Sequence, residues 1–148
     1  MECLTCLSLC GEKRISPGPS IHEGTHWIID HAYPTKLLGW LVMVPKRHVE
    51  ALHDLSAAEF NELGILQAAI TKALFQELHC EKEYLVCFAE GKGFHHVHFH
   101  VIPRSKNLPE DLKGTGIFTM LRTEEKDAVS RDEIILLSQK LTSALTKE

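Results

Sequence analysis

The sequence has no long hydrophobic run and no strong excess of charge of one sign. Its longest apolar stretch, Leu37–Pro45, covers nine residues, whereas a membrane-spanning helix needs about 20. Its 16 Lys and Arg residues stand against 20 Asp and Glu residues, and broad binding to duplex nucleic acid needs clustered cations that displace counterions. We therefore expect no membrane span and no nucleic-acid partner, while a small anionic ligand is compatible with this charge.

The amino terminus lacks the basic segment and apolar core of a secretory signal. Residues 1–6 contain no Lys or Arg, and Glu12–Arg14 interrupts the apolar residues. We expect a cytoplasmic protein on this basis. The five cysteines are an odd number, and in a reducing compartment cysteines are more often free thiols or metal ligands than a disulfide framework.

Length and strand pattern predict one domain over residues 1–148. A chain of 148 residues, 44% of them hydrophobic, is long enough for one sizeable core. The prolines of Ser16–Ser20 predict a loop in the N-terminal thirty residues. Four stretches rich in aromatic and β-branched residues predict strands, the first two forming an antiparallel hairpin. These are residues 26–33, 38–44, 83–89 and 94–102, with 90–93 a flexible connection and Pro103 ending the last strand.

Two capping boxes predict the starts of two helices and place the chain in the α+β class. They are Ser56–Glu59 and Ser130–Glu133. Residues 106–127, which lie between the last strand and the second box, are expected to be irregular. The first helix should end near His79–Cys80. Apolar residues at helical spacing predict the buried stripes. They are Phe60, Leu63, Leu66, Ile70, Leu74 and Leu78 in the first helix, and Ile134, Leu137, Leu141 and Leu145 in the second.

The densest chemical signal is a row of histidines. Ten are present, four of them within residues 95–100. Because side chains alternate along a strand, His96, His98 and His100 should share one face. Three charged imidazoles so close together are costly, so at least one should be neutral and able to act as a nucleophile, a base or a metal ligand. The alternative is a solvated strand face that happens to be rich in histidine, and His95 is better explained as structural.

The segment His96–Ile102 resembles the His-φ-His-φ-His-φ-φ signature, with φ apolar, of the histidine triad (HIT) nucleotide hydrolases and transferases. Gly39–His48 is similar to the family's segment that ends in Pro-x-x-His. The likeness covers about residues 27–104. It implies an α+β half-barrel with an antiparallel sheet of about five strands and two main helices, usually a homodimer. The family core would span about residues 20–104, and the C-terminal helix about 130–146.

The resemblance also implies a reaction with a small-molecule nucleotide as the partner. The family cleaves at the α-phosphorus of nucleoside 5′-phosphate derivatives, here an adenosine phosphoramidate or a dinucleoside polyphosphate. His98 would be the nucleophile and form a nucleotidyl-histidine that water resolves, while His100 donates to the phosphoryl oxygens. The third member of the triad is His96. Backbone N–H groups near Gly91 and Gly93 would approach the phosphate, although an ordinary turn explains these glycines equally well.

The sequence departs from the family at two positions. Trp40 stands where many relatives have His, and Gly93 stands where some have a hydroxyl residue. Trp40 is either a core residue or a wall of the nucleotide pocket. Asp30 is the candidate for the acidic residue that binds ribose. These departures leave open a second function, a nucleotide-binding protein with little turnover.

Cys3 and Cys6 form a Cys-x-x-Cys pair that is suited to bind a metal. Some members of the HIT superfamily close a zinc site with two such cysteines, the His of Pro-x-x-His and the first triad histidine. Here the last two are His48 and His96, which gives a structural zinc site. The alternatives are free thiols, or a pairing of Cys6 with Cys10. His96 would then serve either the metal or the phosphate, and a zinc-binding module without nucleotide chemistry is the third functional hypothesis.

Overall fold

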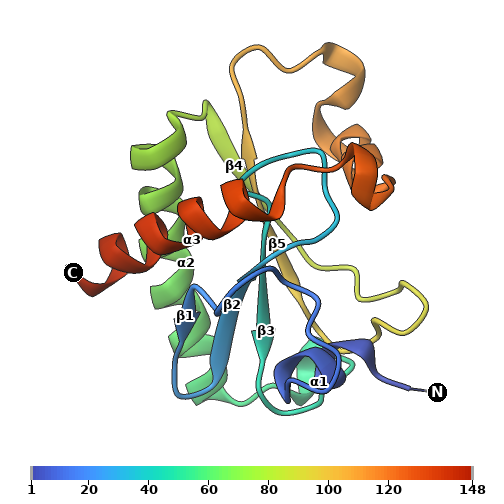
Figure 1. The fold of residues 1–148 in the computed structure, drawn as a ribbon. Helices are drawn as coiled ribbons and strands as arrows, with labels where there is room; N and C mark the ends of the chain where they lie inside the picture. Colours follow the sequence, from blue (N-terminus) through green and yellow to red (C-terminus); the bar gives the residue numbers. More distant parts are fainter. Residues whose placement is uncertain (1, 148) are drawn as a thin grey trace.

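The computed structural model describes residues 2–147 and contains one five-stranded sheet with the order β1-β2-β3-β5-β4 (Figure 1). Every neighbouring pair of strands is antiparallel. This confirms the α+β class and the five-stranded antiparallel sheet. The strands are β1 (His22–Glu23), β2 (Trp27–His31), β3 (Leu41–Pro45), β4 (Lys82–Val86) and β5 (Phe99–Arg104).

Three α-helices accompany the sheet: α1 (Leu4–Leu9), α2 (Ala57–Leu78) and α3 (Arg131–Thr146). α2 starts at the predicted capping box, in which Ser56 and Glu59 bond reciprocally, and it ends at His79 in a left-handed conformation. At the start of α3 only half of the predicted box forms. The Ser130 hydroxyl accepts from the Glu133 backbone N–H, and the Glu133 carboxylate accepts from that hydroxyl and not from the Ser130 backbone N–H.

α2 and α3 cover one face of the sheet (Figure 1), and the main core lies between them and the strands. Because side chains alternate, Trp27, Ile29, Leu41 and Met43 face this core, and the opposite face carries Asp30, Val42 and Val44. The helices thus leave the second face free for a ligand pocket. The core includes Trp27, Ile29, Leu41, Met43 and Val101 from around the sheet, Ile70 and Leu74 from α2, and Leu137 and Leu141 from α3.

A second, smaller core lies under the chain after β5. Trp40, Ile102 and Ile117 are fully buried in it. Residues 106–127, expected to be irregular, contain three short 3-10 helices, and the longest, η3, supplies Ile117. The three are η2 (Glu110–Leu112), η3 (Gly114–Leu121) and η4 (Glu125–Asp127). A further 3-10 helix, η1 (Leu52–Asp54), precedes α2.

Three local predictions were wrong. The N-terminal segment, expected to be a loop, contains α1 and β1, and α1 is capped by Cys3, whose sulfur accepts from the Cys6 N–H. Phe60 is 44% exposed and lies outside the buried stripe of α2. The last strand begins only at Phe99 and continues through Pro103. Pro103 is tolerated because β3 pairs with β5 only as far as Val101, which leaves one side of Pro103 without a partner strand.

No helix within residues 2–147 combines the length and the apolar character that a membrane span requires.

Candidate functional site

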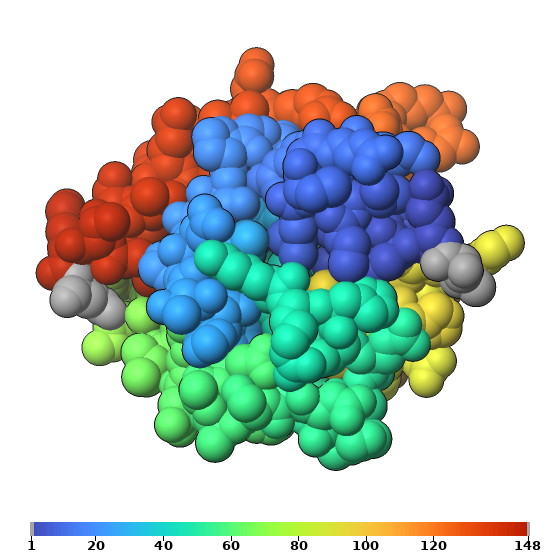
Figure 2. Space-filling model, turned by 90° about the horizontal axis from the view of Figure 1, so that it is seen from below, coloured from blue at the N-terminus to red at the C-terminus, as the bar shows by residue number. Residues whose placement is uncertain are grey.

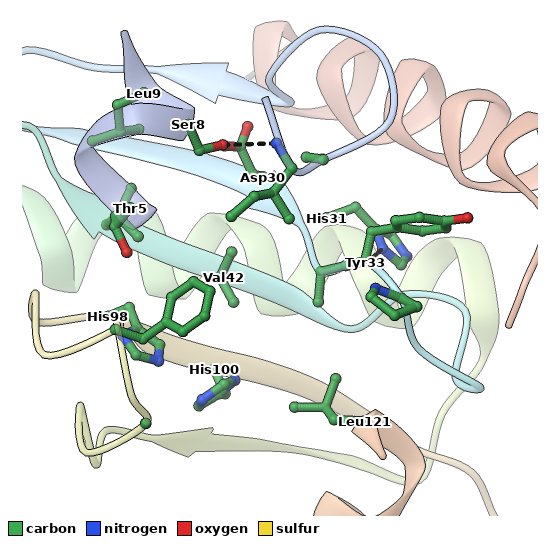
Figure 3. A pocket seen from close by; sticks show the side chains of 17 residues that line it. Thr5, Ser8, Leu9, Asp30, His31, Tyr33, Val42, His98, His100 and Leu121 are labelled. Atoms are coloured by element: carbon green, nitrogen blue, oxygen red, sulfur yellow. Dashed lines mark hydrogen bonds between the residues drawn. The ribbon is translucent and has the colours of Figure 1, made fainter. Parts of the chain in front are cut away.

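A cavity of about 410 Å³ lies on the face of the sheet opposite α2 and α3 (Figure 3). Helix α1 forms one wall with Thr5 and Ser8, and the sheet contributes Asp30 and Val42. The other side of the cavity is lined by triad histidines and by the connection before them. The predicted site residues that line the cavity are His98, His100, Asp30 and Gly91.

His98 faces the cavity with one ring nitrogen held by the backbone. Its Nδ1 lies 2.9 Å from the carbonyl oxygen of His96. A carbonyl oxygen only accepts hydrogen bonds, so Nδ1 carries a proton, and in the neutral ring the lone pair is on Nε2. The side chain is half-buried and its ring centroid lies 4.9 Å from that of His100. His98 therefore has the chemical form of a nucleophile or base.

His100 is buried against the smaller core. Its side chain lies at the cavity wall, and its Nδ1 is 3.0 Å from Nε1 of Trp40. Burial lowers the pKa of His100 to about 4, and the nearby His98 acts in the same direction. His100 is therefore neutral near pH 7. Trp40 itself is fully buried beside Ile102 and Ile117, and it contacts His100 from behind rather than lining the cavity.

Asp30, the residue expected to bind ribose, is paired with Arg14 at the cavity wall. The guanidinium contacts both carboxylate oxygens, at 2.9 and 3.0 Å. The Asp30 carboxylate is 8% exposed and the Arg14 side chain 29% exposed. Each carboxylate oxygen has further lone pairs for a ligand hydroxyl, so the ion pair orients the carboxylate without saturating it.

Gly93 has a structural explanation in the contact between the loop and α1. Its φ is +83°, and a Cβ built there would lie 2.8 Å from Cδ1 of Leu4. Its carbonyl oxygen accepts from the Leu4 N–H at 3.0 Å. The glycine thus lets α1 pack directly onto the loop that precedes the triad, whereas Gly91 lines the cavity.

The structure brings together the four predicted metal ligands from three parts of the chain. Their ligand atoms all lie within 4.8 Å of one another. Sγ of Cys6 is 3.3 Å from Nδ1 of His48 and 3.5 Å from Nδ1 of His96, and Sγ of Cys3 is 3.8 Å from the same nitrogen of His96. In Figure 2 the N-terminal residues and the segment near residue 50 lie side by side, as the contact between Cys6 and His48 requires.

Both histidines of the cluster, His48 and His96, are oriented by acceptors on the far side of their rings. Nε2 of His48 is 2.9 Å from a carboxylate oxygen of Glu50, and Nε2 of His96 is 2.8 Å from the carbonyl oxygen of Pro45. An acceptor at Nε2 keeps the proton there and leaves Nδ1 free to bind a metal, an arrangement typical of metal-binding histidines. Two sulfurs and two such nitrogens suit tetrahedral zinc.

A metal would bind the two thiols of the cluster as thiolates. Burial and the neighbouring Cys3 thiol raise the pKa of Cys6 to about 11, whereas a bound divalent cation removes thiol protons. His96 is fully buried, and burial lowers its pKa. Its Nδ1 faces the sulfurs and its Nε2 faces Pro45, so neither ring nitrogen is free for a phosphate. The geometry favours the metal over the phosphate as the partner of His96.

Sequence reasoning missed several contributors to this region. Arg14 and Glu50 lie among other charged residues, and no motif marks either of them as part of a site. Thr5 reaches the cavity only because α1 packs there, and Phe118 reaches the ring of His100 from η3, with centroids 5.0 Å apart. Phe118 lies beyond residue 104, where the sequence showed no family motif.

Comparison with known proteins identifies the family. A sequence profile of the HIT domain matches residues 28–107, which is more than half of the chain. The chain belongs to the HIT family. No curated protein matches the sequence significantly.

Solved structures support the same fold at low sequence identity. A hypothetical histidine triad nucleotide-binding protein from Sulfolobus tokodaii has a TM-score of 0.72 at 16% identity, over 98% of this chain and 93% of that one. A zinc-bound histidine triad family protein from Mycobacterium smegmatis has a TM-score of 0.68 at 19% identity, over 98% and 94%. Diadenosine triphosphate hydrolase from Plasmodium falciparum has 0.64 at 14%, over 87% and 77%.

Proposed function

We propose that the protein is a nucleotide hydrolase or nucleotidyl transferase that acts at the α-phosphate of nucleoside 5′-phosphate derivatives. The observation that supports this most directly is the state of His98, which faces a nucleotide-sized cavity with the Nε2 lone pair free and the Nδ1 proton held by a backbone carbonyl. Membership of the HIT family and the fold shared with a diadenosine triphosphate hydrolase agree with this assignment.

In the proposed first step, Nε2 of His98 attacks the α-phosphorus and the bond to the leaving group breaks. The leaving group departs with the bonding electron pair and takes up a proton from solvent, and the nucleotidyl group becomes attached to His98. In the second step water attacks the same phosphorus and loses a proton to solvent. The phosphorus–Nε2 bond breaks, its electron pair returns to the imidazole, and the nucleoside monophosphate leaves. His100 donates to the phosphoryl oxygens in both steps, and Asp30 binds the ribose hydroxyls.

The experiment that tests this function is a time course of AMP release from adenosine 5′-phosphoramidate and from diadenosine polyphosphates, measured side by side. The two classes share the α-phosphoryl group and differ in what leaves, so the faster substrate identifies the leaving group. AMP release from either class supports the hydrolase. AMP binding by calorimetry without release from either class contradicts it and favours a nucleotide-binding protein.

We also propose that Cys3, Cys6, His48 and His96 hold a structural zinc ion. The support is geometric: two sulfurs and two Nδ1 atoms converge on one point, and Nε2 of each histidine is hydrogen-bonded to an acceptor. Four protein ligands leave no open position, so the metal would stabilise the fold rather than activate water. When bound, it would fasten α1 to the segment after β3 and to the first histidine of the triad, and so keep Thr5 in the pocket wall.

We further propose a homodimer formed through β4. This strand lies at the edge of the sheet and leaves one row of backbone groups unpaired. Leu85 on β4 is 45% exposed and Phe88 just after it is 58% exposed. An antiparallel edge is self-complementary about a two-fold axis, which suits a second copy of this chain. Light scattering should give twice the chain mass, and Leu85→Lys should shift the mass toward the monomer.

A further inference from the structure

We propose that Trp40 is a positioning residue that fixes His100 in a single neutral tautomer, with its proton on Nε2, so that His100 acts only as a hydrogen-bond donor to the phosphoryl group. This inference rests on the proposed nucleotidyl chemistry for its consequence. The tautomer itself follows from contacts within the protein.

The contact between the two rings admits only one assignment of protons. Nε1 of Trp40 lies 3.0 Å from Nδ1 of His100. An indole N–H donates hydrogen bonds and never accepts them, so Nδ1 of His100 must present its lone pair. A proton on Nδ1 would place two N–H groups against each other in a region where Trp40 is fully buried and His100 is 8% exposed. The single remaining proton of the neutral ring is therefore on Nε2.

Neighbouring aromatic rings hold His100 in this orientation. The rings of Trp40, Phe118 and His98 lie edge-to-face with it, at centroid distances of 5.7, 5.0 and 4.9 Å. A flip of the imidazole would remove Nδ1 from the indole and leave a buried donor on Trp40 without its partner. None of these three rings carries a carboxylate, and the one titratable ring among them, His98, disfavours a positive charge on His100.

As a consequence, His98 and His100 have different chemical roles. The His96 carbonyl places the proton of His98 on Nδ1, which leaves Nε2 as the nucleophile. The Trp40 indole does the reverse for His100, which leaves Nε2–H as a donor. In the opposite tautomer the Nε2 lone pair of His100 would face a phosphoryl oxygen and repel it. Trp40 therefore acts on the transition state through His100, without touching the substrate.

The test compares Trp40→Phe with Trp40→His and with a matched control, Trp27→Phe. Trp27 is also fully buried and donates its indole N–H, to the Glu59 carbonyl at 2.7 Å, but it lies in the main core. Trp40→Phe removes the donor, whereas histidine at position 40 still has an N–H to offer. The first readout is the tautomer of His100 in protein labelled with ¹⁵N-histidine, from long-range ¹H–¹⁵N spectra assigned with His100→Gln.

We expect wild type and Trp27→Phe to show the Nε2–H tautomer of His100 and Trp40→Phe to show a mixture. The second readout is hydrolysis of adenosine 5′-phosphoramidate. Trp40→Phe should lower kcat several-fold with KM nearly unchanged, because only part of the molecules then present the Nε2–H donor to the transition state, and Trp40→His should recover part of this loss.

A wild-type spectrum with His100 protonated on Nδ1, or on both nitrogens at pH 7, would overturn the proposal. So would equal losses of kcat in Trp40→Phe and Trp27→Phe, since both would then reflect damage to the core. The spectrum needs no substrate, so it separates this inference from the proposed function. An Nε2–H tautomer in a protein that cleaves neither substrate class supports the positioning by Trp40 while contradicting the hydrolase.

Discussion

Arg14 contacts both carboxylate oxygens of Asp30, at 2.9 and 3.0 Å, in the wall of the cavity. The same guanidinium donates to the Gly18 carbonyl at 3.1 Å. A planar guanidinium matches a carboxylate at two points, so the pair fixes the plane of the carboxylate as well as its position. It also fastens the N-terminal segment to β2.

Arg14→Gln should therefore destabilise the protein more than the double variant Arg14→Gln with Asp30→Asn. The single change leaves a carboxylate that is 8% exposed without its cation, at a cost on the order of 2 kcal/mol for a partly exposed pair. The double variant has no orphan charge. Urea denaturation of the four proteins in the cycle measures this coupling, and additive effects of the two substitutions would contradict the pairing.

Cys6→Ser should lower the metal content and the melting temperature, whereas Cys10→Ser should change neither. Cys10 is exposed, is the C-cap of helix α1 and lies outside the four-residue cluster. Because a structural metal binds the folded chain, its loss removes stability that a thiol-to-hydroxyl change alone does not. Elemental analysis and thermal unfolding with and without a chelator are the measurements. Equal metal content in both variants would rule out the cluster.

Glu50→Gln should weaken metal binding by about 10- to 100-fold while all four ligands remain. The carboxylate lies 2.9 Å from Nε2 of His48, and a neutral amide is a weaker acceptor that makes the imidazole less basic. Competition with a chromogenic chelator measures the affinity. Asp54→Asn is the matched control, because Asp54 lies 3.8 Å from another exposed histidine, His53, outside the cluster. Similar affinities of Glu50→Gln and wild type would contradict this role.

His31 should make the folded state sensitive to acid. It is 1% exposed, its Nδ1–H donates to the Ala32 carbonyl and its Nε2 accepts from the Gly39 N–H. Burial lowers its pKa from 6.5 to about 4. Below pH 6.5 the unfolded chain therefore binds a proton that the folded chain does not, so the free energy of unfolding falls as pH drops from 6.5 to 4.

The loss from His31 alone is on the order of 3 kcal/mol at pH 4. His31→Gln lacks the titrating group, so its unfolding free energy should depend less on pH in this window, whatever its stability at pH 7. Other titrating groups, His100 among them, are present in both proteins and cancel in the difference. Urea denaturation at several pH values is the measurement, and parallel curves for the two proteins would contradict the buried neutral His31.

The parts of the structure that sequence reasoning predicted are those with a local signature. The capping box at Ser56 forms as expected, and His98 and His100 face the cavity while Val97 and Phe99 pack at the main core, although β5 starts only at Phe99. His96, expected on the same face, lies instead in the cluster with Cys3, Cys6 and His48. The structure also brings Cys3 and His96 together across 93 positions. That prediction came from the family resemblance and not from the residues themselves.

The parts that could not be predicted depend on long-range packing. Helix α1 has six residues, too few for a periodic pattern to show. The pairing of Arg14 with Asp30 and the contact of Phe118 with His100 join distant segments without any local mark. The role of Trp40 was equally hidden, because a buried tryptophan looks the same in sequence whether or not its N–H meets a catalytic group.

The mass of a trapped nucleotidyl adduct would show whether His98 is the nucleophile. Wild type and His98→Asn are mixed with adenosine 5′-phosphoramidate or diadenosine triphosphate, quenched in base to protect a phosphorus–nitrogen bond, digested and mapped. We expect an adenylyl group on His98 in wild type, none in His98→Asn, and a fall in kcat of several orders of magnitude in His98→Asn with AMP binding retained. Undiminished turnover in His98→Asn, or an adduct on another residue, would contradict this expectation.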